Sequence, residues 1–134
     1  MCLTVFRYIH EFRPDIVVLA TGAHYFDIPD YTFAMGLIAE KIRDVRRTHK
    51  VPPKFIWKTI NPGHMNCAPE LVPIAISALA KQISIDNPYK WNLHKKYDEV
   101  SVNVSRALGM NVIDMSPLYL RPDGYVIMMK FFKI

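Results

Sequence analysis

Three short apolar runs divide the chain, and each is bounded by polar or turn-forming residues. They cover residues 16–20, 55–59 and 111–114 and are rich in valine, isoleucine and aromatic side chains. Continuous apolar runs of this length are typical of strands buried on both faces, as in parallel sheets. The pattern therefore predicts three parallel strands.

Helical periodicity fills the segments between these runs. Apolar positions recur at helical spacing over 3–12, where Pro14 stops the element, and over 30–48, with Asp30 as the expected N-cap. The segment 69–85 is also expected to be helical, starting near Pro73. A last helix places Tyr97, Val100, Val104 and Leu108 on one stripe and ends at Gly109 as a C-cap.

The alternation of strands and helices predicts the fold class. We expect a single α/β domain over residues 1–134, three-layered, with a short parallel sheet and flanking helices, as in flavodoxin-like folds. Hydrophobic residues make up 51% of the chain, which argues against disorder. The longest apolar run is far shorter than the roughly 18 residues of a membrane span, so no membrane segment is expected.

Charge and cysteine content narrow the function only slightly. The net charge of +5 is concentrated in 41–50 and 89–97, where cations at helix ends explain it better than a nucleic-acid surface. The two cysteines, Cys2 and Cys67, form no metal motif or disulfide framework and leave the redox compartment open. No cofactor motif is present, and the N-terminus lacks the pattern of a signal peptide.

Polar residues follow each predicted strand. The carboxyl ends of parallel strands lie at one edge of a sheet, where ligands usually bind. A shared site at this edge is the functional interpretation, and ordinary polar surface loops are the alternative. The residues expected at this edge are Gly22, His24, Asn61, His64, Asp114 and Ser116.

These segments resemble a known family. "VVLATGAHYF", "WKTINPGHMNC" and "VIDMSPLYLRPDGY" are similar, in order and approximate spacing, to the later blocks of the SGNH (GDSL-type) hydrolases, in the PC-esterase and trichome-birefringence-like branch. The resemblance implies an esterase or acyltransferase acting on O-acylated carbohydrate or a small acyl ester, in the secretory pathway. It implies catalytic roles for His64 and Asp114, and substrate or oxyanion binding by Gly22, His24, Asn61, Arg121 and Asp123.

The sequence departs from the family at the catalytic blocks. It contains no Gly-Asp-Ser, which would supply the nucleophile, and no Asp-x-x-His; Ala20 and Tyr125 replace the family's Asn and His. We therefore expect a chain that is inactive or truncated as given, with a non-catalytic carbohydrate-binding or partner-binding module as the alternative. A dyad of Cys67 with His64 is chemically possible, and Ser116 lacks an exposing turn motif.

Several site candidates also have purely structural explanations. His24 could be a turn histidine bonded to the backbone, and His64 could cap a loop. Asp114 could cap the turn that follows its strand. Arg121 and Asp123 fit a type I turn with Pro122 at its second position.

Overall fold

The computed structural model describes residues 2–22, 24–61 and 91–120. Three strands form one sheet in the order β1-β2-β3: β1 (Ile16–Leu19), β2 (Lys54–Lys58) and β3 (Asn111–Ile113). Both pairings are parallel, with Val17 opposite Phe55 and Trp57 opposite Val112. The prediction of three parallel strands is confirmed.

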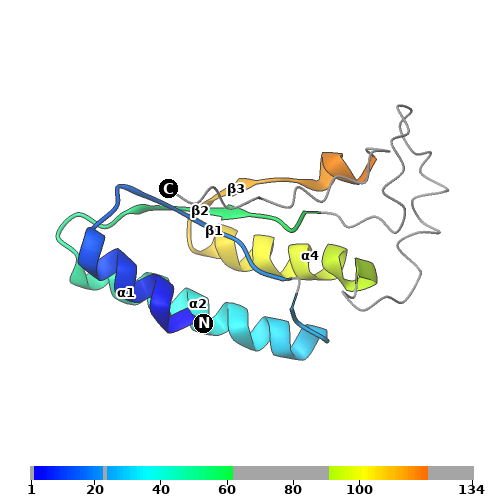
Figure 1. Ribbon diagram of the computed structural model, residues 1–134, viewed down its shortest axis with the longest axis horizontal. Helices are drawn as coiled ribbons and strands as arrows, with labels where there is room; N and C mark the ends of the chain where they lie inside the picture. The colour runs from blue at the N-terminus through cyan, green and yellow to red at the C-terminus, as the bar shows by residue number, and fades with distance from the viewer. Residues whose placement is uncertain (1, 23, 62–90, 121–134) are drawn as a thin grey trace, which may run out of the picture.

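The described helices are α1 (Cys2–Phe12), α2 (Ile28–Thr48) and α4 (Trp91–Ala107), followed by a short 3-10 helix, η1 (Ser116–Leu120). All three α-helices lie on the same side of the sheet (Figure 1). The connections β1–α2–β2 and β2–α4–β3 move across the sheet in one direction, and right-handed crossovers then place both helices on one face. The predicted helix at 69–85 lies outside the described residues.

The prediction that the strands are buried on both faces is wrong for β1. Phe55 and Trp57 are buried against the helices, whereas Ile16 and Val18 on the other face are 57% and 53% exposed. One face of β1 is therefore exposed. The described residues form two layers, and the helix predicted at 69–85, on which the three-layer prediction also depends, lies outside them. The α/β class itself is confirmed.

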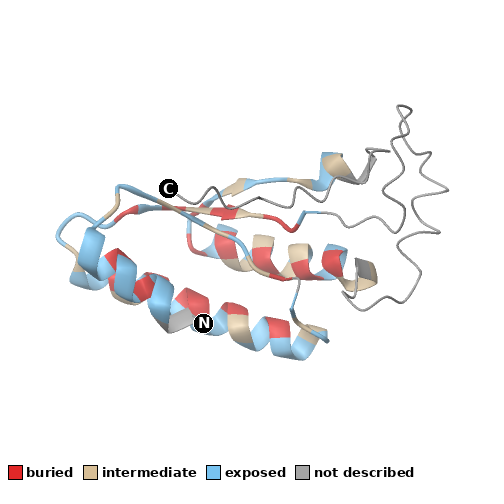
Figure 2. Cartoon of the chain, in the orientation of Figure 1, coloured by how far each residue is buried: buried red, intermediate tan, exposed pale blue. Residues whose placement is uncertain are grey.

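The core fills the space between the sheet and the helices, as the band of buried residues in Figure 2 shows. Tyr31 and Met35 of α2 and Tyr97 of α4 are almost fully buried there, beside Trp57. The Tyr31 and Tyr97 rings lie 4.5 Å apart between centroids, so the two helices meet through aromatic packing.

Helix ends follow local capping chemistry. Asp27, rather than the predicted Asp30, is the N-cap of α2; its carboxylate accepts the Asp30 N–H at 2.8 Å. Pro29 in the first turn explains the earlier start, because a helix tolerates a missing N–H there. The predicted C-cap at Gly109 is confirmed. Gly109 has φ +64°, and the Met110 N–H donates to the Ser105 carbonyl, the bond of a Schellman motif.

Candidate functional site

The carboxyl ends of the three strands lie at one edge of the sheet, because the strands are parallel and Leu19, Trp57 and Val112 stand in neighbouring register. This arrangement places Gly22 after β1, Asn61 after β2 and Asp114 after β3 at that edge. His24 follows in the loop between β1 and α2. The other predicted site residues, His64, Arg121 and Asp123, lie outside the described residues, as does Cys67.

Gly22 packs directly against the end of β2. A Cβ atom added at Gly22 would lie 2.0 Å from Cδ1 and 2.6 Å from Cγ1 of Ile60, which is buried. Any side chain at this position would collide with Ile60. The loop after β1 and the extension of β2 are therefore in contact, and only glycine permits that approach.

Two tyrosines hold the loop after β1 in place. The Tyr31 hydroxyl donates to the Thr21 carbonyl at 3.2 Å, and the Tyr97 hydroxyl donates to the Tyr25 carbonyl at 3.0 Å. Burial raises the pKa of both phenols, so they stay neutral donors at physiological pH. The backbone around Gly22 is thus fixed from α2 and from α4.

Thr59 joins the ends of β2 and β3. Its N–H donates to the Ile113 carbonyl at 3.0 Å, and its hydroxyl oxygen accepts the Met115 N–H at 2.7 Å. The side chain is only 2% exposed. This buried hydroxyl is bonded to the segment that follows β3, so it keeps the ends of β2 and β3 together beyond their last paired residues.

Asp98 of α4 is the acidic group that sequence analysis missed. Its carboxylate accepts the Ile60 N–H at 2.8 Å, directly beside the strand ends. Burial raises the pKa of the Asp98 carboxyl from an ordinary 3.8 to about 6; the Ile60 N–H lowers it, the charge of Asp114 raises it and that of Lys58 lowers it. A carboxyl with this pKa can exchange a proton near neutral pH.

Lys58 and Asn61 complete the polar cluster around Asp98. The Lys58 ammonium donates to the Asn61 side-chain oxygen at 2.7 Å. Burial lowers the pKa of Lys58, and the negative charge of Asp98 opposes that shift. The cluster therefore combines a cation, an amide and a carboxyl group that titrates near neutrality.

Asp114 and Ser116 bond to each other. Asp114 accepts the Ser116 N–H at 2.8 Å through one oxygen and the Ser116 hydroxyl at 2.9 Å through the other. This geometry agrees with the capping explanation of Asp114, since both bonds close the start of η1. Ser116 is exposed, and its hydroxyl donates to a carboxylate, which is a weak base for activating a nucleophile.

Sequence patterns could have suggested Asp98 only indirectly. It directly follows Tyr97, which the apolar stripe of the helix placed in the core. An acid beside a buried stripe is a candidate for partial burial. Its partner Ile60 is 38 residues away, so the contact depends on how α4 docks.

The described residues contain neither a metal-binding cluster nor a helix that could span a membrane. In ranges 2–22, 24–61 and 91–120, no three His, Cys, Asp or Glu side chains gather closely enough to hold a metal ion. None of the helices described there is both long enough and apolar enough to cross a membrane.

Comparisons with known proteins do not identify the chain: no protein family, no curated protein and no solved structure matches it.

Proposed function

We propose that this chain is an SGNH-type carbohydrate O-acyl esterase-like or acyltransferase-like domain, with its substrate crevice at the carboxyl edge of the sheet. The supporting observation is that Gly22, Asn61 and Asp114, one from each block that resembles the family, follow three neighbouring parallel strands. In such sheets the carboxyl edge is where ligands bind. The family resemblance supplies the acyl carbohydrate as substrate class.

Each described group has a role in this proposal. The Gly22 N–H is the donor for an ester carbonyl oxygen, because its tight contact with Ile60 fixes the backbone there. Lys58 and Asn61 bind sugar hydroxyls beside it. Asp98, with a pKa of about 6, accepts a hydrogen bond from a sugar hydroxyl and can exchange its proton.

The missing catalytic blocks limit the expected activity. A triad enzyme without its nucleophile and base keeps only the contributions of the oxyanion hole and of binding. Purified protein should therefore hydrolyse p-nitrophenyl acetate no faster than an unrelated protein at the same concentration. Any residual rate should survive Ser116→Ala, because the Ser116 hydroxyl is bonded to Asp114 rather than to a base.

A non-catalytic carbohydrate-binding module is the second candidate, and the closed Asp114–Ser116 contact favours it. The two candidates separate in one pair of measurements. Titration of an acetylated and a deacetylated xylo-oligosaccharide, followed by NMR, reports binding, and the release of acetate reports turnover. Binding without acetate release supports the module. Robust release that Ser116→Ala abolishes would contradict the expectation of low activity, and failure to bind either sugar would refute both candidates.

A further inference from the structure

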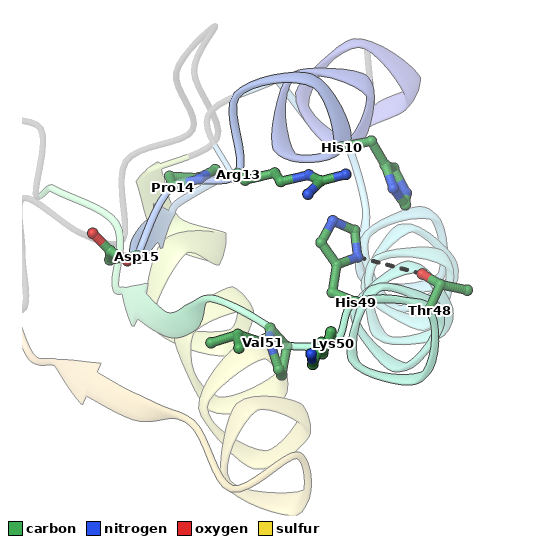
Figure 3. A pocket seen from close by; sticks show the side chains of 9 residues that line it. His10, Arg13, Pro14, Asp15, Thr48, His49, Lys50 and Val51 are labelled. Atoms are coloured by element: carbon green, nitrogen blue, oxygen red, sulfur yellow. Dashed lines mark hydrogen bonds between the residues drawn. The ribbon is translucent and has the colours of Figure 1, made fainter.

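A cavity lies at the edge of the sheet opposite to Gly22, Asn61 and Asp114, where the chain enters β1 and β2. Its volume is about 600 Å³, and it is formed by the end of α1, the turn into β1, the end of α2 and the segment leading to β2 (Figure 3). None of the residues of the proposed ester crevice lines it. The polar side chains of its lining are His10, Arg13, Asp15, Thr48, His49 and Lys50.

Positive and imidazole groups converge on one part of this cavity. The His10 and His49 rings lie 4.6 Å apart between centroids, at an angle of 41°. The Arg13 guanidinium extends toward both rings in Figure 3, while the Asp15 carboxylate lies away from them. Within the described residues, neither Arg13 nor Lys50 forms an ion pair. Their charges are therefore available to a ligand.

The environment of His49 orients its ring toward the cavity. Its Nδ1 lies 3.1 Å from the Val45 carbonyl oxygen and 3.4 Å from the Thr48 hydroxyl. A carbonyl can only accept, so Nδ1 carries a proton in this contact. The other ring nitrogen, Nε2, is the one left to bind a ligand.

Arg13 adopts a backbone conformation that most side chains avoid. Its φ is +46°, and its N–H donates to the Ile9 carbonyl at 3.1 Å, which closes α1. Glycine is the usual residue at such a helix end, because a Cβ atom makes this left-handed backbone conformation unfavourable. Arg13 nevertheless adopts this conformation, and its exposed side chain directs a guanidinium toward the two imidazoles.

We propose that this cavity binds a phosphate group, either inorganic phosphate or the phosphate of a small phosphomonoester. A guanidinium presents paired N–H donors that match the oxygens of a phosphate, and the N–H of the His10 imidazole adds a further donor. The Nε2 of a neutral His49 ring accepts from the hydroxyl of a monohydrogen phosphate. The cavity is larger than a phosphate ion, so it has room for a substituent. The adjacent guanidinium disfavours a metal cation between the two rings.

The cluster has a structural explanation that the experiment must exclude. The C-terminal ends of α1 and α2 both lie at this cavity, and helix dipoles favour cations there. Helix-end stabilisation alone would require no ligand. It would also predict that the affinity for phosphate depends only on the overall positive charge of the protein.

The test is isothermal titration calorimetry of the full chain with inorganic phosphate and with glycerol 2-phosphate, at constant ionic strength. We expect saturable one-to-one binding of at least one of them. Arg13→Gln should weaken it about tenfold or more, because a charge-assisted hydrogen bond is lost. The matched control, Arg43→Gln, removes the same charge from an exposed position of α2 outside the cavity and should leave affinity unchanged.

Each outcome decides the proposal. If glycerol 2-phosphate binds more tightly than inorganic phosphate, the remaining volume of the cavity holds the substituent of the ester. If the two bind equally, the cavity recognises the phosphate group alone. Both results support the proposal. Equal weakening by the two variants would show unspecific charge attraction and overturn it. No saturation at millimolar ligand would also overturn it, as would tight Ni²⁺ binding without phosphate binding. Circular dichroism of each variant confirms that the fold is retained.

Discussion

Replacing Asp98 by asparagine directly tests the electrostatics around the ends of β2 and β3, where the substrate crevice is proposed. The side-chain amide oxygen that Asp98→Asn introduces can still accept the Ile60 N–H, so the variant removes the titratable charge and keeps the hydrogen bond. In the wild type, burial raises the pKa of Asp98 to about 6. The folded state therefore binds this proton more tightly than the unfolded state does.

The sign of the pH effect follows from linkage. A carboxyl whose pKa is raised in the folded state stabilises the fold below its unfolded pKa of about 4, and this contribution is lost as the pH rises through 6. A shift of about two units corresponds to roughly 3 kcal/mol. Because Asp98 is only partly buried, solvent screening reduces this to about 1–2 kcal/mol.

Urea unfolding followed by tryptophan fluorescence, at pH 4 and pH 7.5, measures the effect. Asp98→Asn should match the wild type at pH 4 and be more stable by about 1 kcal/mol at pH 7.5. The pKa of about 6 already includes the attraction of Asp98 to Lys58, so the loss of that attraction makes no separate contribution to the expected gain. Glu99→Gln, at an exposed position of the same helix, should change stability by less than about 0.5 kcal/mol at both pH values. A variant less stable than wild type at pH 7.5, or a difference independent of pH, would refute the reasoning.

Substitutions at three positions test other parts of the structure. Gly22→Ala should destabilise the protein by at least about 2 kcal/mol in urea unfolding, because its Cβ would overlap Ile60; an unchanged midpoint would contradict that contact. Thr59→Val should cost about 1–3 kcal/mol by leaving the Met115 N–H without its acceptor, whereas Thr59→Ser should recover most of the loss. Arg13→Gly should raise the thermal midpoint, since glycine adopts the positive φ without strain, and it should weaken phosphate binding. A higher midpoint with unchanged phosphate binding would show that Arg13 is strained but does not bind phosphate.

The sequence was sufficient for features that depend on neighbouring residues. The three strands have apolar runs of a length that suits parallel pairing, and the structure pairs them as predicted. Gly109 was recognisable as a helix end because glycine alone adopts its φ of +64° at little cost. The bond of Asp114 to Ser116 spans only two residues, and capping by Asp114 was one of the alternatives the sequence allowed.

Features that depend on how the helices and strands pack against one another could not be predicted from the sequence pattern. An apolar run looks the same whether one face or both are covered, so the exposure of Ile16 and Val18 could not be predicted. The raised pKa of Asp98 results from burial under the ends of distant strands, which no local pattern encodes. The left-handed conformation of Arg13 was equally hidden, since arginine gives no local signal for it.

The two proposed sites lie at opposite ends of the same strands, and this separation has a consequence. β2 has five residues, which span about 17 Å at the rise of an extended strand. That distance exceeds the screening length of about 8 Å in physiological salt, so charge at one edge has little direct effect on exposed groups at the other. Phosphate binding near Arg13 should therefore leave the pH dependence caused by Asp98 unchanged. A phosphate-induced shift in that pH dependence would require a conformational link through the sheet or through α2, whose two ends lie near opposite edges of the sheet.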